Sequence, residues 1–331
     1  MPTLLIGTTD GLFAKPLDRF SNPHLLGMGG RGYGAIRSLV LPDLKDPMRI
    51  YLSTTRAGVW HSEDSGESWQ EINQGLVYKE VWSLAIQPSS GDLYAGTGPA
   101  SLFRSKDGGS GWEEFEDLRS IEHRSEWFLH LPPYFPHIRD VAFSQSDSSL
   151  VVCAVEEGGI LLTNDAGKSW VNVCDGICPD VHTVAVMPDN PKIILVATGD
   201  GTFRSTDGGS SFERCIGIDK HYSTHVLVDH RVPQAVFAVA SDNQPRHWRT
   251  SIGAGTGFFV SYDSGCSWLR LAQGVAEYLY GGAHSALWDP FDERYVFVGL
   301  SDGSIWRVGL SGSSELWQSG LPPATALAIT E

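Results

Sequence analysis

The sequence has no excess of positive charge. Its 24 Lys and Arg residues stand against 39 Asp and Glu residues, which gives a formal net charge of −15 at pH 7. An acidic chain is poorly suited to the phosphate backbone of nucleic acid and to an anionic membrane surface. We therefore expect neither of them as a partner.

Long apolar runs and sustained helical periodicity are absent as well. No stretch approaches the roughly 20 apolar residues of a membrane span, so we expect no membrane partner. Residues 1–7 lack the basic segment and cleavage site of a signal peptide, which indicates a strand and a cytoplasmic location. Because no segment has a clear 3.6-residue apolar period, we expect an all-β protein.

Cysteine is scarce, and motifs for nucleotide cofactors are missing. The chain has five Cys residues, an odd number at irregular spacing, which is not typical of a disulfide framework. Cys174 and Cys178 form the only close pair, and we interpret all five as reduced structural thiols. No glycine-rich phosphate loop joins a strand to a helix, so we expect no nucleotide cofactor.

What the chain does contain is a short motif, Ser/Thr-x-Asp-x-Gly-x-x-aromatic, in five copies. In such a box the Asp carboxylate accepts backbone N–H groups of its own turn, the Gly adopts positive φ and the ring packs in the core. A strand-rich unit that recurs along the chain is typical of a propeller. The Asp residues of the five boxes, which we expect to be structural, are Asp64, Asp107, Asp165, Asp207 and Asp263.

A second repeat marks the innermost strand of each blade. We expect these strands at 35–41, 80–86, 137–143, 180–186, 223–229, 282–288 and 324–330, with hairpins at 50–62, 93–105, 150–163, 194–205, 235–261 and 295–307. The hairpin at 3–15 has no strand before it, and the strand at 324–330 has none after it. Pairing of the two would close the ring and remove two sheet edges. The sequence therefore predicts one domain, residues 1–331, folded as a seven-bladed β-propeller.

The boxes also carry a family resemblance. The chain resembles the Asp-box, or BNR-repeat, β-propellers, a superfamily that includes sialidases, sortilin-type receptors, xyloglucan-degrading enzymes and a photosystem assembly factor. The resemblance covers nearly the whole chain and implies the propeller fold. It does not single out a function, because the activities of these proteins differ and the boxes lie on the rim.

A typical sialidase is disfavoured by the residues themselves. Resemblance to a sialidase would imply a six-bladed ring with three arginines, a Tyr–Glu pair and an Arg-Ile-Pro type motif. This motif is missing from the sequence. Other glycosidases need two carboxylates across a cleft, whereas Glu156 and Glu157 are adjacent on a turn.

Insertions gather in two classes of loop. They lie between an outer strand and the next inner strand, or between the second and third strands of a blade, and in an up-and-down blade both classes emerge on one face. Loops on a rigid scaffold commonly carry binding residues, so we expect the site there. The insertions are Gly27–Tyr33, Glu116–Pro136, Asp219–Ser223, Ser241–Thr256 and Glu277–Gly281.

Aligning the inner strands places one residue of each blade at the mouth of the central tunnel. Three of these residues, from consecutive blades, are histidines, and three imidazoles with an open position are typical of a catalytic metal centre. We expect a divalent transition metal such as zinc, iron, manganese, nickel or copper. A metal-free anion site and ordinary polar tunnel lining remain alternatives. The aligned residues are Arg37, Trp82, Arg139, His182, His225, His284 and Thr325.

The other polar residues complete a hypothesis about chemistry. Arg37 and Arg139 would hold a carboxylate by bidentate pairing, and Glu156 would act as a base. Further candidates for substrate binding are Trp82, Glu157, Tyr33, His137, Arg246, Trp248 and Tyr278.

The sequence thus favours a metal-assisted hydrolase or lyase that acts on a small anionic molecule at the tunnel mouth. The alternative is a non-catalytic binding or assembly propeller that presents the same face to a protein or peptide. The oligomeric state is not indicated by the sequence.

Overall fold

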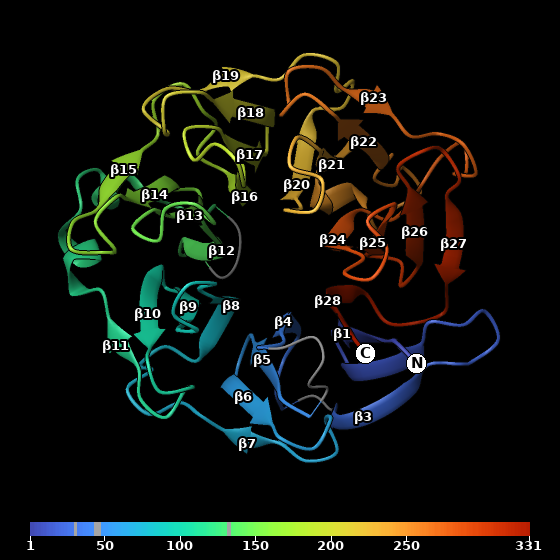
Figure 1. The fold of residues 1–331 in the computed structure, drawn as a ribbon, viewed down its shortest axis with the longest axis horizontal. Helices are drawn as coiled ribbons and strands as arrows, with labels where there is room; N and C mark the ends of the chain where they lie inside the picture. The colour runs from blue at the N-terminus through green and yellow to red at the C-terminus, as the bar shows by residue number, and fades with distance from the viewer. Residues whose placement is uncertain (30–31, 43–47, 131–133) are drawn as a thin grey trace.

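The computed structural model describes residues 1–29, 32–42, 48–130 and 134–331. Seven four-stranded antiparallel sheets are arranged as blades around a central axis (Figure 1), which confirms the predicted seven-bladed β-propeller. Within these residues, helix is limited to the short 3-10 segments η1 (Glu116–Ser120), η2 (Arg124–Glu126) and η3 (Pro245–His247). None of the described helices has the length and apolar character needed to cross a membrane.

The inner strands lie where the second repeat predicts them, within one residue at each end. In ring order they are β28 (Ala324–Thr330), β4 (Ile36–Val40), β8 (Glu80–Ile86), β12 (His137–Phe143), β16 (Val181–Val186), β20 (Tyr222–Val228) and β24 (Ala283–Trp288). The second strands are β1 (Thr3–Thr8), β5 (Ile50–Thr54), β9 (Leu93–Gly98), β13 (Val151–Glu156), β17 (Ile194–Thr198), β21 (Val236–Ser241) and β25 (Tyr295–Leu300).

The outer half of each blade completes the sheets. The third strands are β2 (Gly11–Pro16), β6 (Gly58–Ser62), β10 (Ser101–Ser105), β14 (Gly159–Thr163), β18 (Gly201–Ser205), β22 (Gly257–Ser261) and β26 (Ile305–Gly309). The outermost strands are β3 (His24–Gly29), β7 (Gln70–Glu71), β11 (Glu113–Glu114), β15 (Val171–Val173), β19 (Glu213–Arg214), β23 (Leu269–Arg270) and β27 (Glu315–Gln318).

The two ends of the chain share one blade. Strand β28 pairs antiparallel with β1, from Thr3 opposite Thr330 to Thr8 opposite Ala324. The sheet order β28-β1-β2-β3 confirms the closure predicted from the split hairpin. Every residue of β28 is buried, so the closing strand is also part of the core.

The core lies between neighbouring blades, because each sheet packs its two faces against two others. The second strands are therefore apolar without alternation: Val236 to Ala240 are all fully buried. One cluster joins Phe237 and Phe258 of one blade to Trp288 and Trp306 of the next. This packing fixes the inner strands around the axis.

The box turns join the third strand of a blade to its outermost strand. In the turn after β6, Asp64 Oδ1 accepts hydrogen bonds from Ser62 Oγ and from the Ser68 backbone N–H, each at 2.8 Å. The other four box Asp residues accept equivalent bonds within their own turns. These bonds lower the pKa of Asp64, Asp165 and Asp207 to about 2.

Each inner strand contains one extra residue. In β16, for example, Val181 lies opposite Thr198 and Thr183 lies opposite Ala197, so His182 forms a β-bulge. A bulged residue is not part of the regular pairing, and bulges can re-aim a side chain. The bulged residues of the seven inner strands are Arg37, Trp82, Arg139, His182, Thr224, His284 and Thr325.

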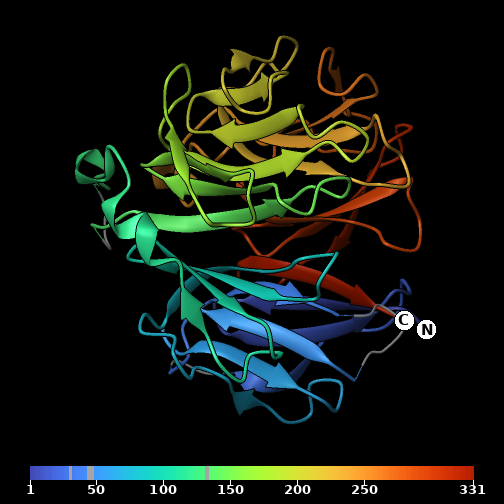
Figure 2. The same ribbon diagram turned by 60° about the vertical axis from the view of Figure 1, so that its left-hand side comes forward.

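The insertions enlarge one side of the ring. In the turned view (Figure 2), the segment that carries η1 and η2 projects beyond the blades. Parts of two predicted insertions, residues 30–31 of Gly27–Tyr33 and 131–133 of Glu116–Pro136, lie outside the described residues. The box turns are on the opposite side, because turns between third and outermost strands emerge away from turns between second and third strands.

Candidate functional site

A cavity of about 410 Å³ lies at the mouth of the central tunnel. We call it the mouth cavity. It lies above a narrower tunnel pocket of about 290 Å³, and the two share five lining residues. The residues lining the mouth cavity are Arg37, Trp82, Leu129, His137, Arg139, Glu156, Glu157, Asp180, His182, Tyr222, Thr224, Gln244, Pro245, Arg246, Trp248 and His284.

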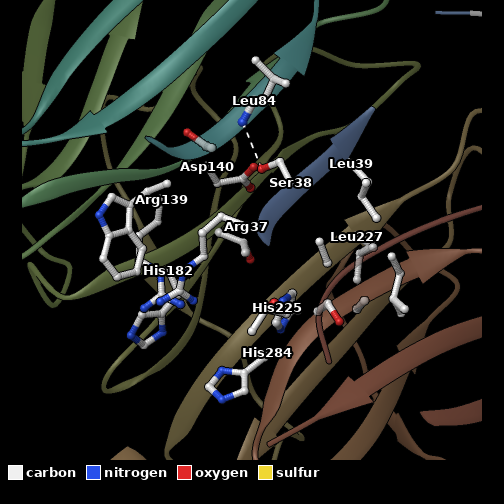
Figure 3. Close-up of a pocket in the computed structure, with 18 of the residues that line it drawn as sticks. Arg37, Ser38, Leu39, Leu84, Arg139, Asp140, His182, His225, Leu227 and His284 are labelled. Atoms are coloured by element: carbon white, nitrogen blue, oxygen red, sulfur yellow. Dashed lines mark hydrogen bonds between the residues drawn. The ribbon is translucent and has the colours of Figure 1, made fainter. Parts of the chain in front are cut away.

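The bulges arrange the tunnel residues in two tiers. The upper tier consists of the bulged residues named above, and six of the seven line the mouth cavity. The lower tier consists of the next residue of each inner strand, and all of its members line the tunnel pocket (Figure 3). The lower-tier residues are Ser38, Ser83, Asp140, Thr183, His225, Ser285 and Ala326.

The expected alignment of His225 with His182 and His284 is off by one residue. The bulge of β20 falls on Thr224, and His225 pairs with Val239 in the regular ladder. His225 therefore lies in the lower tier and is absent from the lining of the mouth cavity, whereas Thr224 is present there. The three histidines line one tunnel but do not share one level.

Both ring nitrogens of His182 are engaged by the protein. Nδ1 lies 2.6 Å from the Ser223 carbonyl oxygen, which places a proton on Nδ1. Nε2 lies 3.0 Å from the hydroxyl of Tyr222 and 3.1 Å from Oδ1 of Asp180. The side chain is 1% exposed. His182 therefore has no nitrogen left for a metal.

The three-histidine metal centre expected from the sequence does not fit this arrangement. Among residues 1–29, 32–42, 48–130 and 134–331, no group of three His, Cys, Asp or Glu side chains could hold a metal ion. The register of His225 and the bonds of His182 give the physical reason.

Glu156 lies between two basic side chains. Its Oε2 is 2.8 Å from Arg139 Nη1 and 2.8 Å from His137 Nε2. Burial alone would raise the pKa of Glu156, but Arg139 and His137 outweigh it and hold this pKa well below its usual range. The carboxylate therefore stays ionised and is a weak base. Its geometry suits the orientation of Arg139 better than the role of general base.

Arg37 is a cation without a counter-charge. Its guanidinium Cζ lies 4.1 Å from the centre of the Trp82 ring, and Trp82 in turn stacks on His137 at 3.7 Å between ring centres. In the part of the chain that the structure describes, Arg37 forms no ion pair, and its buried Nε has no hydrogen-bond partner. Burial and the nearby charge of Arg139 lower the pKa of Arg37 to about 10, so it is charged at neutral pH.

The remaining histidines of the tunnel are neutral. Burial, with the charges of Arg139 and His182, lowers the pKa of His225 to about 3. Burial, with the charges of Arg37 and Arg139, lowers the pKa of His284 to about 3. Both rings are therefore neutral at neutral pH and add no positive charge to the tunnel.

Two further carboxylates line the mouth cavity. Glu157 lies in the turn between β13 and β14 with φ of +60°. Burial, together with the charges of Asp180 and Glu156, raises its pKa. Asp180 was not among the predicted site residues. Its spacing from His182, two residues along an extended strand, was the sequence signal that could have identified it.

The segment 242–256 forms one wall of the cavity. Lys220 Nζ is 2.7 Å from Asp242 Oδ2 at its start, and the Trp248 indole N–H donates to the Asn243 carbonyl at 2.8 Å. Trp248 is 7% exposed and its edge faces His284. Arg246 lines the cavity with its exposed side chain bonded to His247. The wall is therefore anchored to the blade on both sides of Trp248.

Two predicted substrate-binding residues lie elsewhere. Tyr33 packs edge-on against Trp60, 5.3 Å between ring centres, in the core of its blade. The Tyr278 hydroxyl donates to the Ile252 carbonyl at 2.8 Å, so it supports the segment 242–256 from outside the cavity. Neither residue lines the mouth cavity.

Comparison with known proteins gives similarity of fold. No family model and no curated protein matches the chain. The GH74 xyloglucanase from Xanthomonas campestris superposes with a TM-score of 0.72 at 18% identity, over 96% of this chain and 52% of that one. The structure described as YCF48 bound to D1 peptide superposes with a TM-score of 0.63 at 15% identity, over 92% of this chain and 87% of that one. U3-55K superposes with a TM-score of 0.60 at 13% identity, over 91% of this chain and 86% of that one.

These neighbours include enzymes and propellers of other kinds. The chain spans about half or less of the length of the GH74 enzymes. It covers 52% of the enzyme from Xanthomonas campestris, 46% of the enzyme from Niastella koreensis and 37% of an ancestral enzyme. All identities are below 20%, so the comparisons support the seven-bladed propeller and leave the Asp-box family assignment unconfirmed.

Proposed function

We propose that this protein binds a small anionic molecule, one that bears a carboxylate, in the mouth cavity. The observation that carries the proposal is the unpaired guanidinium of Arg37. A partly buried cation that forms no ion pair is costly, and planar guanidinium pairs well with a carboxylate. Arg139 adds a second positive charge nearby, and its geometry is fixed by Glu156.

The size of the cavity supports a small ligand over a protein partner. About 410 Å³ lies in the range of small-molecule pockets, and the lining combines aromatic and aliphatic surface with a few charged side chains. A propeller that presents a broad face to a peptide remains the alternative. The test below separates the two, because a peptide-binding face would not require Arg37 for binding of a small carboxylate.

Calorimetric titration with acetate, butyrate and succinate tests the proposal. We expect binding of at least one of them, and a loss of about a hundredfold in affinity for Arg37→Gln, since truncation of one partner of a buried charge pair is costly. The matched control is Arg214→Gln on the rim, whose guanidinium is 45% exposed. The folded stability of Arg37→Gln should be unchanged or higher, because a desolvated charge is removed. Equal affinity of Arg37→Gln and the unaltered protein would contradict the proposal.

A hydrolase or lyase is a second candidate, favoured by the bonds of His182. With the Nδ1 proton directed at the Ser223 carbonyl, Nε2 accepts the phenolic proton of Tyr222, whose side chain lines the cavity. Tyr222 could then transfer a proton to or from a ligand held by Arg37. Release of nitrophenol from a nitrophenyl hemisuccinate tests this candidate. We expect turnover that Tyr222→Phe abolishes while binding of a monocarboxylate such as butyrate persists.

A further inference from the structure

The charges of the mouth cavity are divided between two sides. Arg37 belongs to β4, whereas Glu157 follows β13 and Asp180 precedes β16. In the ring, β4 neighbours β28 and β8, and β16 neighbours β12 and β20. Strands β4 and β16 therefore face each other across the axis (Figure 1). The cavity wall thus carries Arg37 on one side and Asp180 across the axis, with Glu157 on the blade of β12 between them.

The basic side chains near Arg139 already have partners within the protein. Arg139 and His137 both lie 2.8 Å from the same oxygen of Glu156. His182 Nε2 lies 3.1 Å from Asp180 and its hydrogen bond to Tyr222 uses the same nitrogen. After these contacts, three charged side chains of the cavity wall have no ion pair within the described residues: Arg37, Arg246 and Glu157.

Glu157 lacks a cationic partner. Within the described ranges it forms no ion pair; the imidazoles of His130 and His182 influence it only from a distance. Its neighbours Asp180 and Glu156 are like charges, and they oppose its ionisation together with burial. A bound cation would remove this repulsion, as a bound anion would compensate Arg37.

We propose that the ligand of the mouth cavity is a small zwitterion, with its carboxylate on Arg37 and a protonated amine on Glu157 and Asp180. The proposal rests on the anion site proposed above and specifies its substrate class. Trp248 and Leu129 also line the cavity and supply apolar surface against which the methylene groups of a short linker can pack.

The opposed charges give selectivity as well as affinity. A dianion would leave Glu157 facing a like charge, and a monocarboxylate would leave it unpaired. A plain amine would face the unpaired Arg37. Only a molecule that carries both charges satisfies both ends of the cavity, which distinguishes this site from a general anion trap.

Paired titrations test the inference. The probes are glycine, β-alanine and γ-aminobutyrate, each compared with the carboxylate of equal carbon number: acetate, propionate and butyrate. We expect the amino acid of matching length to bind about tenfold tighter than its carboxylate, as for a partly desolvated ion pair. Glu157→Gln should abolish this gain and leave carboxylate affinity unchanged or improved, because a repulsive charge is lost.

The matched control is Glu213→Gln, which removes one exposed carboxylate from β19 on the rim and should preserve the gain. Carboxylate affinity within Glu157→Gln shows that the variant is folded. If carboxylates bind but the amine adds nothing, or if Glu157→Gln keeps the full gain, the zwitterion inference is overturned and the anion site stands. If no probe binds, with or without an amine, the anion proposal fails and this inference fails with it.

Discussion

At the box turns, Asp165 accepts hydrogen bonds from Thr163 Oγ1, from the Ser169 backbone N–H and from Ser169 Oγ, all within its own turn. At the tunnel mouth, Glu157 shares its surroundings with two other carboxylates and has no ion pair within the described residues. Both are exposed to water to some extent, and both are acidic. The bonds of Asp165 are complete within its own turn, whereas Glu157 has no cationic partner among the described residues.

Charged groups with hydrogen-bond partners inside the protein therefore differ in role from charged groups without an ion pair. The box carboxylates, which are hydrogen-bonded within their own turns, hold these turns in place and contribute to the stability of the fold. The unpaired Arg37 and Glu157 cost stability and are expected to be retained for binding. The predictions below test this division through three changes, starting with the one that should have the largest effect.

The largest effect on stability is expected for Glu156→Gln. This change leaves Arg139 and His137 without the carboxylate that both of them contact. Breaking a buried ion pair by removing one partner costs about 3 kcal/mol. Urea denaturation should show a loss of this size, with Glu113→Gln on the exposed strand β11 as a neutral control. A loss no larger than that of the control would show that the mouth charges are as independent as those of the rim.

A change of pH should have an intermediate effect on stability. The tunnel histidines and the box Asp residues should lose their contributions in different pH ranges. The pKa of His284 is lowered to about 3, so the unfolded chain takes up this proton first and stability falls as pH drops from about 6.5 towards 3. The box Asp residues have pKa values lowered to about 2, and their contribution is lost only as pH falls from about 4 towards 2. Because the pKa of His225 is also lowered to about 3, His284→Gln should make the upper part of a stability–pH curve shallower and leave the lower part unchanged. A curve unchanged above pH 4 would contradict the assignment.

The smallest effect is expected for Asp263→Ala in the turn after β22. The change removes the acceptor of bonds from Ser261 and Ser267, which are exposed turn contacts, and should cost about 1 kcal/mol. Affinity for small carboxylates should stay the same, because the box lies on the other side of the ring. Thermal unfolding and titration of the same sample check both statements. A large loss of binding with little loss of stability would place the box turns in the site.

The fold was largely predictable from the sequence because its signals are local and repeated. Each box and each inner strand could be recognised by itself, and the repeats confirmed one another. The split hairpin at 3–15 and the strand at 324–330 predicted the closure that β28 and β1 make. Residues such as Trp82, His137, Arg139 and Trp248 reach the mouth cavity as expected.

The site was less predictable because it depends on register. Thr224 and His225 are both polar residues ahead of an apolar run, and a shift of one residue exchanges the tiers. The observed register matches Val226 and Val228 of β20 with Val184 and Val186 of β16, a correspondence that the sequence offered. The partners of His182, however, come from the next blade and from a turn, so no local pattern revealed that both its nitrogens are engaged.

The bulge in every inner strand has a consequence for how such a protein can change over evolutionary time. Each bulged residue stands outside the regular ladder, so its side chain can be replaced without disturbing the pairing that holds the blade. Seven such positions, one per blade, surround one opening. Substitutions there can change the lining of the tunnel, and the same ring can acquire a new ligand while its blades keep their ancestral packing.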